Sequence, residues 1–292
     1  MMTMLSREQS QDRESGINFE SKDTNYHELT RIMEIDNIYN MDCLEGMRQM
    51  EAESVDLTVT SPPYDNLRTY NGYCFDFENI ARELYRVTKQ GCVVVWVVGD
   101  ATIEGDETGS SFRQALFFKE IGFKLNDTMI WHKVNPCPSM AASRYTQAFE
   151  YMFVFSKGKP KTFNPIKVPC VHAGQNYTST FRERGTDGNP DYDRKHKSIV
   201  IHDERMEYNV WRIGVQQEKF PHPAVFPEKI AADHIKSWSN EGDIVLDPFM
   251  GSGTTAKVAR ALNRHYIGFE ISAEYCDIIN KRLEQTKTLF DL

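Results

Sequence analysis

Apolar positions along most of the chain alternate between short runs rich in β-branched residues and longer stretches with helical spacing. The runs expected to form strands are 35–42, 55–60, 92–98, 123–132, 149–156, 244–247 and 265–270. Residues 92–98 form an unbroken apolar run, which is typical of a parallel strand buried on both faces. This alternation predicts an α/β protein in which helices cover both faces of one sheet.

Helical periods fill the segments between these strands. Phe77, Ile80, Ala81 and Leu84 recur at helical spacing, so a helix with one apolar face is predicted there. Further helices are expected near 44–50, 111–120, 230–238, 254–262 and 272–283. Ser272 is positioned to N-cap the last of them.

The chain divides into four segments by composition. Residues 1–33 are polar and are expected to form an extension outside the core. Residues 34–157 and 221–292 carry the strand and helix pattern, so they are expected to be two halves of one domain. Residues 158–220 lose this periodicity and gather Pro, Gly, Asn and charge, which predicts an irregular insertion.

Length and composition narrow the class of protein. The chain has 292 residues, of which 40% are apolar, and this suits one large or two medium domains. No stretch approaches the roughly 18 apolar residues of a membrane span, and the first ten residues are too polar for a signal peptide, so a cytoplasmic protein is expected. The six cysteines lie far apart, without the spacing typical of zinc ligands, so no metal site is expected.

Charge is unevenly distributed along the chain. The formal net charge is −8, and residues 1–60 hold 5 basic and 13 acidic residues, so the excess lies entirely there. Residues 157–200 instead hold nine basic and four acidic residues, interleaved with aromatic residues. A DNA-binding surface is therefore permitted in the insertion, and a solvated loop with ordinary lysines is the alternative.

Residues 247–256 place two glycines between a buried strand and the start of a helix. Gly251 and Gly253 let the backbone approach a ligand closely, and the N–H groups of the following helix favour an anion. Glu270 ends the next strand, where its carboxylate can accept hydrogen bonds from a ribose diol. The combination predicts a nucleoside-containing ligand.

Two ligands match this pattern. Gly251, Gly253 and Ala256 satisfy the dinucleotide motif G-x-G-x-x-G/A, so a nicotinamide oxidoreductase is one reading. A dinucleotide needs two mononucleotide halves, however, and only one strand and one helix are predicted after Gly253. S-adenosylmethionine satisfies the whole pattern: its ribose on Glu270, its ammonium near Asp247 and its carboxylate at the helix start.

A double-proline turn follows the strand at 55–60. In Ser61-Pro62-Pro63-Tyr64, two prolines fix the backbone and remove two N–H donors. The Ser61 hydroxyl and the Pro62 carbonyl can then accept hydrogen bonds from a substrate amine, and such acceptors favour its nucleophilic geometry. Tyr64 offers a ring on which an extruded base could stack.

These two motifs resemble those of the amino-methylating DNA methyltransferases, in the permuted group that carries the catalytic (D/N/S)-P-P-(Y/F) motif before the cofactor motif. Residues 60–64 and 247–255 match its two defining segments in that order, and 222–228 and 266–272 are similar to its flanking cofactor segments. The resemblance covers about residues 35–290. It implies a Rossmann-like sheet of seven strands with one antiparallel edge strand, and a target-recognition region in the insertion.

The resemblance also assigns roles to residues. It implies that 34–157 is the catalytic half, with Ser61, Pro62, Pro63 and Tyr64 around the base. It implies that 221–292 binds the cofactor, together with Asp42 at the tip of the first strand, beside the adenine. The expected cofactor residues are Asp42, Phe226, Asp247, Phe249, Gly251, Ser252, Gly253, Thr254, Thr255 and Glu270.

The acceptor and the partners stay open at this stage. Ser61 in the first motif position resembles the cytosine N4 enzymes, whereas adenine N6 enzymes usually carry Asp there, so cytosine N4 is favoured and adenine N6 is the alternative. A non-catalytic DNA-binding module and a methyltransferase acting on RNA or on a protein glutamine are further alternatives. Double-stranded DNA is the expected partner, and a cognate restriction endonuclease and a homodimer are compatible with the resemblance.

Overall fold

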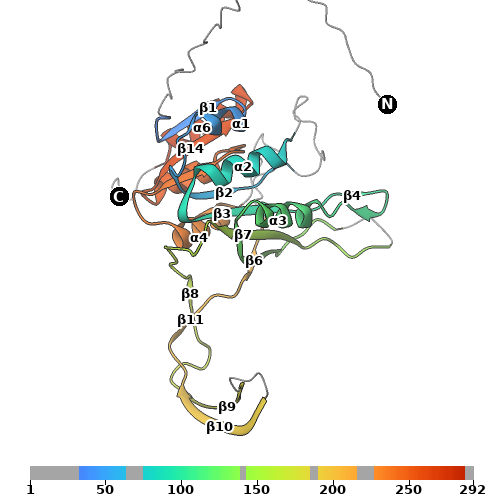
Figure 1. Ribbon diagram of the computed structural model, residues 1–292, viewed down its shortest axis with the longest axis vertical. Coiled ribbons are helices and arrows are strands. Elements are labelled where there is room, and N and C mark those ends of the chain that lie inside the picture. The colour runs from blue at the N-terminus through green and yellow to red at the C-terminus, as the bar shows by residue number, and fades with distance from the viewer. Residues whose placement is uncertain (1–32, 64–74, 139–142, 185–189, 216–226, 287–292) are drawn as a thin grey trace, which may run out of the picture. The chain divides into compact units, whose positions relative to one another are not determined.

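One large sheet organises the computed structural model, which describes residues 33–63, 75–138, 143–184, 190–215 and 227–286. Its strands are β1 (Asn37–Asn40), β2 (Val55–Thr60), β3 (Thr88–Val98), β6 (Lys124–Lys133), β7 (Phe149–Ser156), β12 (Val210–Ile213), β13 (Ile244–Asp247) and β14 (His265–Glu270). Their spatial order is β1-β14-β13-β2-β3-β7-β6-β12 (Figure 1). Only β7 runs antiparallel to its neighbours in this sheet.

The α/β class with a mostly parallel sheet is confirmed, but two details of the expected sheet differ. The described residues form eight strands in it, and the antiparallel strand β7 lies between β3 and β6, not at an edge. The extra strand is β12, which pairs parallel with the outer side of β6. Strand β7 pairs with β3 on one side and with β6 on the other, so it lies inside the sheet whether or not β12 is present.

Six helices cover the two faces of this sheet within the described residues: α1 (Cys43–Gln49), α2 (Phe77–Val87), α3 (Ser110–Glu120), α4 (Glu228–Trp238), α5 (Thr254–Ala261) and α6 (Ala273–Glu284). Residues of α1, α2 and α3 pack in one core cluster, and residues of α4, α5 and α6 pack in another. Helices from residues 34–157 and helices from residues 221–292 therefore cover opposite faces. None of the described helices has the length and apolar character needed to cross a membrane.

Strand β3 separates the two cores. Val93, Val95 and Val97 belong to the cluster with α4, α5 and α6, whereas Val94 and Trp96 belong to the cluster with α1, α2 and α3. Because successive strand residues point to opposite faces, an unbroken apolar run is what a strand covered on both sides requires. The prediction of a buried strand from the run 92–98 is confirmed.

The chain reverses its direction across the sheet between β2 and β13. From β2 the chain continues through α2 to β3 on one side, and from β13 it continues through α5 to β14 on the other side. In open α/β sheets, such a reversal leaves a crevice outside the carboxyl ends of the two strands, and ligands bind there. The carboxyl ends of β2 and β13 are therefore the place to look for a site.

The predicted insertion contains two short ladders in addition to β12. Strands β8 (Lys167–Pro169) and β11 (Glu204–Met206) pair antiparallel, and so do β9 (Asn176–Arg184) and β10 (Pro190–Val200). A further pair, β4 (Thr102–Ile103) and β5 (Asp106–Glu107), follows β3. The insertion is therefore less irregular than its composition indicates.

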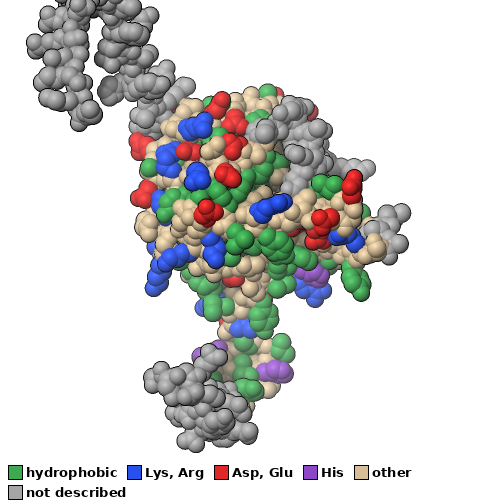
Figure 2. Space-filling model, turned by 45° about the vertical axis from the view of Figure 1, so that its right-hand side comes forward, with side chains coloured by type: hydrophobic (Ala, Val, Ile, Leu, Met, Phe, Trp, Pro, Cys, Tyr) green, Lys and Arg blue, Asp and Glu red, His purple; other side chains and the backbone are tan. Residues whose placement is uncertain are grey.

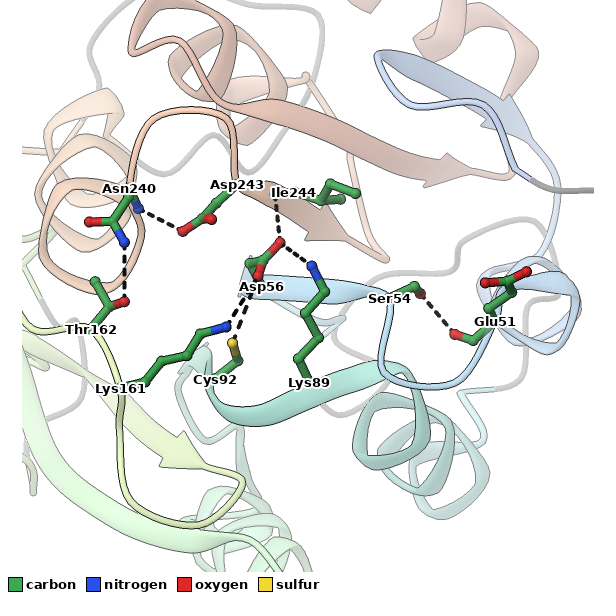
Figure 3. A network of polar contacts seen from close by, with 10 residues as sticks. All are labelled: Glu51, Ser54, Asp56, Lys89, Cys92, Lys161, Thr162, Asn240, Asp243 and Ile244. Carbon is green, nitrogen blue, oxygen red and sulfur yellow. Dashed lines mark hydrogen bonds and ion pairs between the residues drawn. The ribbon is translucent and has the colours of Figure 1, made fainter.

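The start of the insertion is fastened at the amino ends of the central strands (Figure 3). Asp56, at the start of β2, accepts a hydrogen bond from the Ile244 amide at 3.1 Å and pairs with Lys89 at 2.7 Å and with Lys161 at 3.6 Å. Beyond Lys161, the Phe163 ring stacks on Trp238 of α4 at a centroid distance of 4.8 Å. These contacts hold residues 161–163 against the main sheet.

Candidate active site

The two motifs meet at the carboxyl ends of β2 and β13. Strand β2 ends at Thr60, directly before the double-proline segment, and β13 ends at Asp247, directly before the glycine turn. The Thr60 hydroxyl donates a hydrogen bond to the Asp247 carboxylate, with 2.6 Å between Oγ1 and Oδ1. Two segments separated by 187 positions are thus in direct contact at the crevice where the chain reverses direction.

Asp247 is held by neutral donors in a buried position. Its side chain accepts hydrogen bonds from the Thr60 hydroxyl and from the Phe249 amide, at 3.0 Å, and only 1% of the residue is exposed. Burial raises the pKa of Asp247 to about 6, although hydrogen bonds from Thr60, Thr255 and the Phe249 amide oppose the rise.

No cationic side chain of the described residues forms an ion pair with Asp247. The Glu270 carboxylate is likewise without an ion pair in the described part of the chain, and burial raises its pKa. Buried carboxylates in proteins are usually paired with a cation or bound to a metal. The crevice therefore has the electrostatic character that suits a cationic ligand.

Glycine is required in the turn after Asp247. Gly251 has φ = 53° and Gly253 has φ = 80°, in the left-handed region that glycine adopts without strain. A Cβ at Gly253 would lie 2.7 Å from Ile279 Cγ2 of α6, so a side chain would also collide with the core. The turn leads directly into α5, whose first residue is Thr254.

Glu270 connects the glycine turn to the end of β14. Its Oε2 accepts a hydrogen bond from the Gly251 amide at 2.9 Å, and its Oε1 accepts one from the Ser272 amide at 2.9 Å. An ionised carboxylate has about four lone-pair positions, so two such bonds leave capacity for a ribose diol. The residues present fit the nucleoside part of S-adenosylmethionine.

Several of the predicted cofactor residues lie beneath the turn. Ser252, Thr254 and Thr255 are buried, and the Thr255 hydroxyl donates to the Val59 carbonyl at 3.2 Å. These side chains contribute to the shape of the turn and not to its exposed surface.

The other predicted site residues are placed as follows. Asp42 caps α1, accepting hydrogen bonds from the Leu44 amide at 2.8 Å and from the Glu45 amide at 3.2 Å. The Phe249 ring packs against Trp96 and Phe75. Ser61, Pro62 and Pro63 follow β2, with Pro62 buried, whereas Tyr64 and Phe226 lie outside the described residues.

Two contributors were not predicted from the sequence. The motif 60–64 predicts no separate role for Thr60, yet its hydroxyl is the group that donates a hydrogen bond to Asp247. Arg282 of α6 donates a hydrogen bond to the Ser252 carbonyl and pairs with Glu228 at 3.2 Å. A basic residue in the last turn of a helix has an ordinary role in offsetting the helix dipole, so the sequence carries no signal for the contact of Arg282 with the glycine turn.

A separate cavity of about 240 Å³ opens beyond the carboxyl end of β3. Hydrogen-bonding and aromatic side chains line it, among them Asp100, Gln147 and Tyr151. Because β3 is the neighbour of β2 in the sheet, this cavity lies on the side of the double-proline segment and away from β14.

Comparison with known proteins places the chain in a family. A family model described as DNA methylase, for N6 and N4 methyltransferases, matches residues 55–281. The chain belongs to this DNA methylase family. It is 57% identical over 241 residues to the orphan methyltransferase M.BamHII of Bacillus amyloliquefaciens, a match that covers 79% of this chain and 89% of that protein.

Solved structures share the fold of this DNA methylase. The cytosine-N4-specific PvuII DNA methyltransferase is 20% identical, with a TM-score of 0.61 over 89% of this chain and 97% of that one. The complex of M1.HpyAVI with SAM is 24% identical, with a TM-score of 0.55 over 85% of this chain and 99% of that one. The resemblance inferred from the two motifs is confirmed, as is the prediction of a DNA amino-methyltransferase over a nicotinamide oxidoreductase or a non-catalytic module.

Proposed function

We propose that this DNA methylase transfers a methyl group from S-adenosylmethionine to the exocyclic amine of a base extruded from double-stranded DNA, with cytosine N4 as the favoured acceptor. The hydrogen bond between Thr60 and Asp247 carries the proposal. It joins the turn assigned to the methyl acceptor to the turn assigned to the methyl donor, and direct transfer needs both reactants held in contact.

The carboxyl edge of the sheet supplies the donor site. S-adenosylmethionine, which is bound in the M1.HpyAVI complex, carries a sulfonium whose methyl group is transferred, and it also carries an ammonium. Asp247 would attract the ammonium, Glu270 would accept hydrogen bonds from the ribose, and Gly251 and Gly253 leave room for the ligand against the backbone. These two carboxylates, which have no cationic partner within the described part of the chain, support this assignment.

The double-proline segment supplies the acceptor site. The Ser61 hydroxyl and the Pro62 carbonyl would accept hydrogen bonds from the amine of the base, and Tyr64 would stack on its ring. These acceptors orient the nitrogen lone pair toward the methyl group, and no covalent enzyme intermediate is needed. The cavity beyond β3 lies on this side of the sheet and offers further donors and acceptors for an extruded base.

The choice between cytosine and adenine depends on Ser61. The PvuII enzyme, which has the same fold, is cytosine-N4-specific, and Ser61 occupies the motif position in which adenine enzymes usually carry Asp. The Ser61 hydroxyl is a weaker acceptor than the carboxylate that adenine enzymes usually carry at this position. Adenine N6 is therefore the second candidate. Recognition by residues 158–220, a cognate endonuclease and a homodimer stay predictions.

Mass spectrometry of nucleosides tests the proposal. Unmethylated plasmid DNA is incubated with the protein and with S-adenosylmethionine that carries a ¹³C-labelled methyl group. We expect labelled 4-methylcytosine. Labelled 6-methyladenine would move the assignment to the second candidate, and no labelled nucleoside would contradict the proposal.

A pair of matched variants connects this activity to the double-proline segment. Ser61→Ala should lower turnover by about 100-fold, the usual size of the effect of one oriented polar group, while cofactor affinity is retained. Ser54→Ala is the control, because the Ser54 hydroxyl donates to the nearby Glu51 carbonyl at 2.8 Å, at the opposite end of β2. Equal turnover in the two variants would remove Ser61 from the mechanism.

A further inference from the structure

A side chain of α6 holds the middle of the glycine turn. Ser252 lies between Gly251 and Gly253, both of which have positive φ angles. The first hydrogen bond of α5 is accepted by the Gly253 carbonyl, so the Ser252 carbonyl lies just outside the helix. Arg282 of α6 donates a hydrogen bond from Nη1 to this carbonyl.

The same guanidinium also binds a carboxylate at the start of α4. Its Nη2 lies 3.2 Å from Oε1 of Glu228, the first residue of α4. Lys257 of α5 pairs with the same oxygen at 2.6 Å, so three helices meet at this carboxylate. Two different nitrogens of the planar Arg282 fork therefore bridge the glycine turn and α4.

The position of this bridge connects two segments assigned to the cofactor. Glu228 follows Phe226, an expected cofactor residue outside the described part of the chain, by two positions. Ile279, three positions before Arg282, packs so close to Gly253 that an added Cβ would lie 2.7 Å from it. Because residues three apart share one side of a helix, α6 contacts the turn through an apolar and a charged side chain together.

Burial distinguishes Arg282 from ordinary surface charges. On the face of the main body drawn in Figure 2, the described Lys and Arg side chains are interspersed with Asp and Glu. Exposed pairs of opposite charge contribute little to stability. The Arg282 side chain is only 11% exposed, and it binds a backbone carbonyl as well as a carboxylate. A guanidinium held at two acceptors keeps one orientation and restricts the carbonyl that it binds.

The turn needs such a restraint because of its glycines. Glycine loses more conformational freedom on folding than any other residue. The Gly251 amide is bound by the Glu270 carboxylate, and Arg282 binds the carbonyl of the residue that follows. A turn that is ordered before its ligand arrives lowers the entropic cost of binding.

We propose that Arg282 is a positioning residue for S-adenosylmethionine: it holds the glycine turn in the conformation that binds the cofactor, and Glu228 holds its guanidinium in place. Arg282 acts through the Ser252 carbonyl and not by contact with the cofactor. The inference rests on the proposed function, which assigns the glycine turn to the cofactor, and it goes beyond that function by naming residues that act from outside the site.

The sign of the effect separates positioning from electrostatics. S-adenosylmethionine carries a sulfonium and an ammonium against one carboxylate, so its net charge is positive. A role of Arg282 through its charge alone would oppose binding of such a ligand, and removal of the charge would raise the affinity. Positioning predicts a lower affinity instead.

Two variants of Arg282 test the proposal by isothermal titration calorimetry with S-adenosylmethionine. Arg282→Met removes both bonds of the guanidinium and should weaken binding by about tenfold, because the ligand must then order at least one backbone residue. Arg282→Lys keeps the charge but has one nitrogen for two acceptors, so a loss of about threefold is expected.

Arg86→Met is the matched control. Arg86 lies in the last turn of α2, shortly before β3 begins, and therefore at the other end of the central strands. It also bridges a carboxylate and a backbone carbonyl: it pairs with Glu83 at 2.7 Å and donates to the Met50 carbonyl at 2.9 Å. Its removal should leave the affinity for S-adenosylmethionine unchanged.

Two further readouts separate positioning from a general loss of stability. In the cofactor-free protein, amide hydrogen exchange of residues 248–257 should be about tenfold faster in Arg282→Met than in the wild type. In the methylation assay, the KM for S-adenosylmethionine should rise with the loss of affinity, whereas kcat at saturating cofactor should change by less than about twofold.

Glu228→Gln tests the second contact while the arginine stays in place, and it should lower the affinity by about threefold. Should Arg282→Met fail to fold, Arg282→Lys and Glu228→Gln decide the question by the same measurements. If the variants of Arg282 and Glu228 bind S-adenosylmethionine as tightly as the wild type, or if Arg86→Met loses as much affinity as they do, the positioning role is overturned and the proposed function stands. If the wild-type protein binds no S-adenosylmethionine, the proposed function itself fails.

Discussion

Two buried aspartates lie at opposite ends of the neighbouring strands β2 and β13. Asp56, at the amino ends, is 6% exposed and has two lysine partners, Lys89 and Lys161. Asp247, at the carboxyl ends, is 1% exposed and accepts hydrogen bonds from neutral groups only, within the described residues. Both residues are buried aspartates. They differ in their neighbours, which are lysine side chains at Asp56 and neutral hydrogen-bond donors at Asp247.

Under the proposed function, this difference separates a structural carboxylate, Asp56, from a ligand-binding one, Asp247. The charge of Asp56 is neutralised by the protein's own side chains, which also hold the start of the insertion. The charge of Asp247 is costly to bury, as its raised pKa shows, and a bound cation would offset that cost. Under the proposed function, a bound cofactor would relieve this penalty, and that relief would contribute to the free energy of cofactor binding.

The largest expected effect comes from removing the charge of Asp247. Asp247→Asn should weaken binding of S-adenosylmethionine by about 10- to 100-fold, because a hydrogen bond to a charged group contributes roughly 1.5–3 kcal/mol. Isothermal titration calorimetry measures the affinity. Asp56→Asn is the matched control at the other end of the strands, and a similar loss of affinity in that variant would show that the two carboxylates do not differ in role.

Acid should weaken cofactor binding through the same carboxylate. A cationic ligand binds the ionised form of Asp247, whose pKa is about 6 in the free protein, so affinity should fall by roughly tenfold between pH 7.5 and pH 5. Titration calorimetry across this range gives the profile. In Asp247→Asn this part of the pH dependence should disappear, and a profile unchanged by the substitution would assign it to another group.

The two aspartates should affect the stability of the free protein in opposite directions. In the folded protein, the pKa of Asp247 lies above its ordinary value of 3.8. The favourable contribution of this side chain to the free energy of unfolding is therefore fully present below pH 3.8 and is lost as pH rises through about 6. At pH 7.5, Asp247→Asn should therefore raise the free energy of unfolding by roughly 1–3 kcal/mol. Urea denaturation provides the measurement, and a destabilised variant would contradict the burial penalty.

Asp56→Asn should lower the free energy of unfolding by a smaller amount, about 1–2 kcal/mol, since its lysine partners are partly exposed and the pairs are screened by solvent. Glu204→Gln makes the same change in an exposed ion pair, where Lys167 lies 3.9 Å away, and should alter stability by less than about 0.5 kcal/mol. Equal effects would mean that Asp56 is no more than a surface charge.

Much of the fold could be predicted because its elements have distinct periodicities. The bounds predicted for β2, β7, β13 and β14 agree with the structure, and Ser272 caps α6 as expected, accepting a hydrogen bond from the Tyr275 amide at 3.3 Å. Strand β12 was missed because it has only four residues, carries Arg212 and lies in a segment rich in polar residues. Such a short strand depends on its pairing with β6 and has little signal of its own.

The site was predictable as two motifs but not as one set of contacts. The glycine turn and the double-proline segment each follow a strand, and that could be inferred from residues alone. The contact between Thr60 and Asp247 depends on the register of β2 against β13, in which Leu57 lies opposite Val245, and a single sequence does not specify it. For the same reason, burial of Thr254 and Thr255 could not be foreseen.

The two ends of the insertion lie next to each other. The Glu207 amide donates to the Ile166 carbonyl at 2.8 Å, and Lys167 lies opposite Met206 in the ladder that follows. The forty residues between 166 and 207 therefore begin and end at neighbouring positions. Inserting a loop between two such close ends has only a small entropic cost. If the insertion recognises the target sequence, as proposed, this stretch is a cassette whose exchange would change the target sequence while the methyl-transfer residues stay as they are.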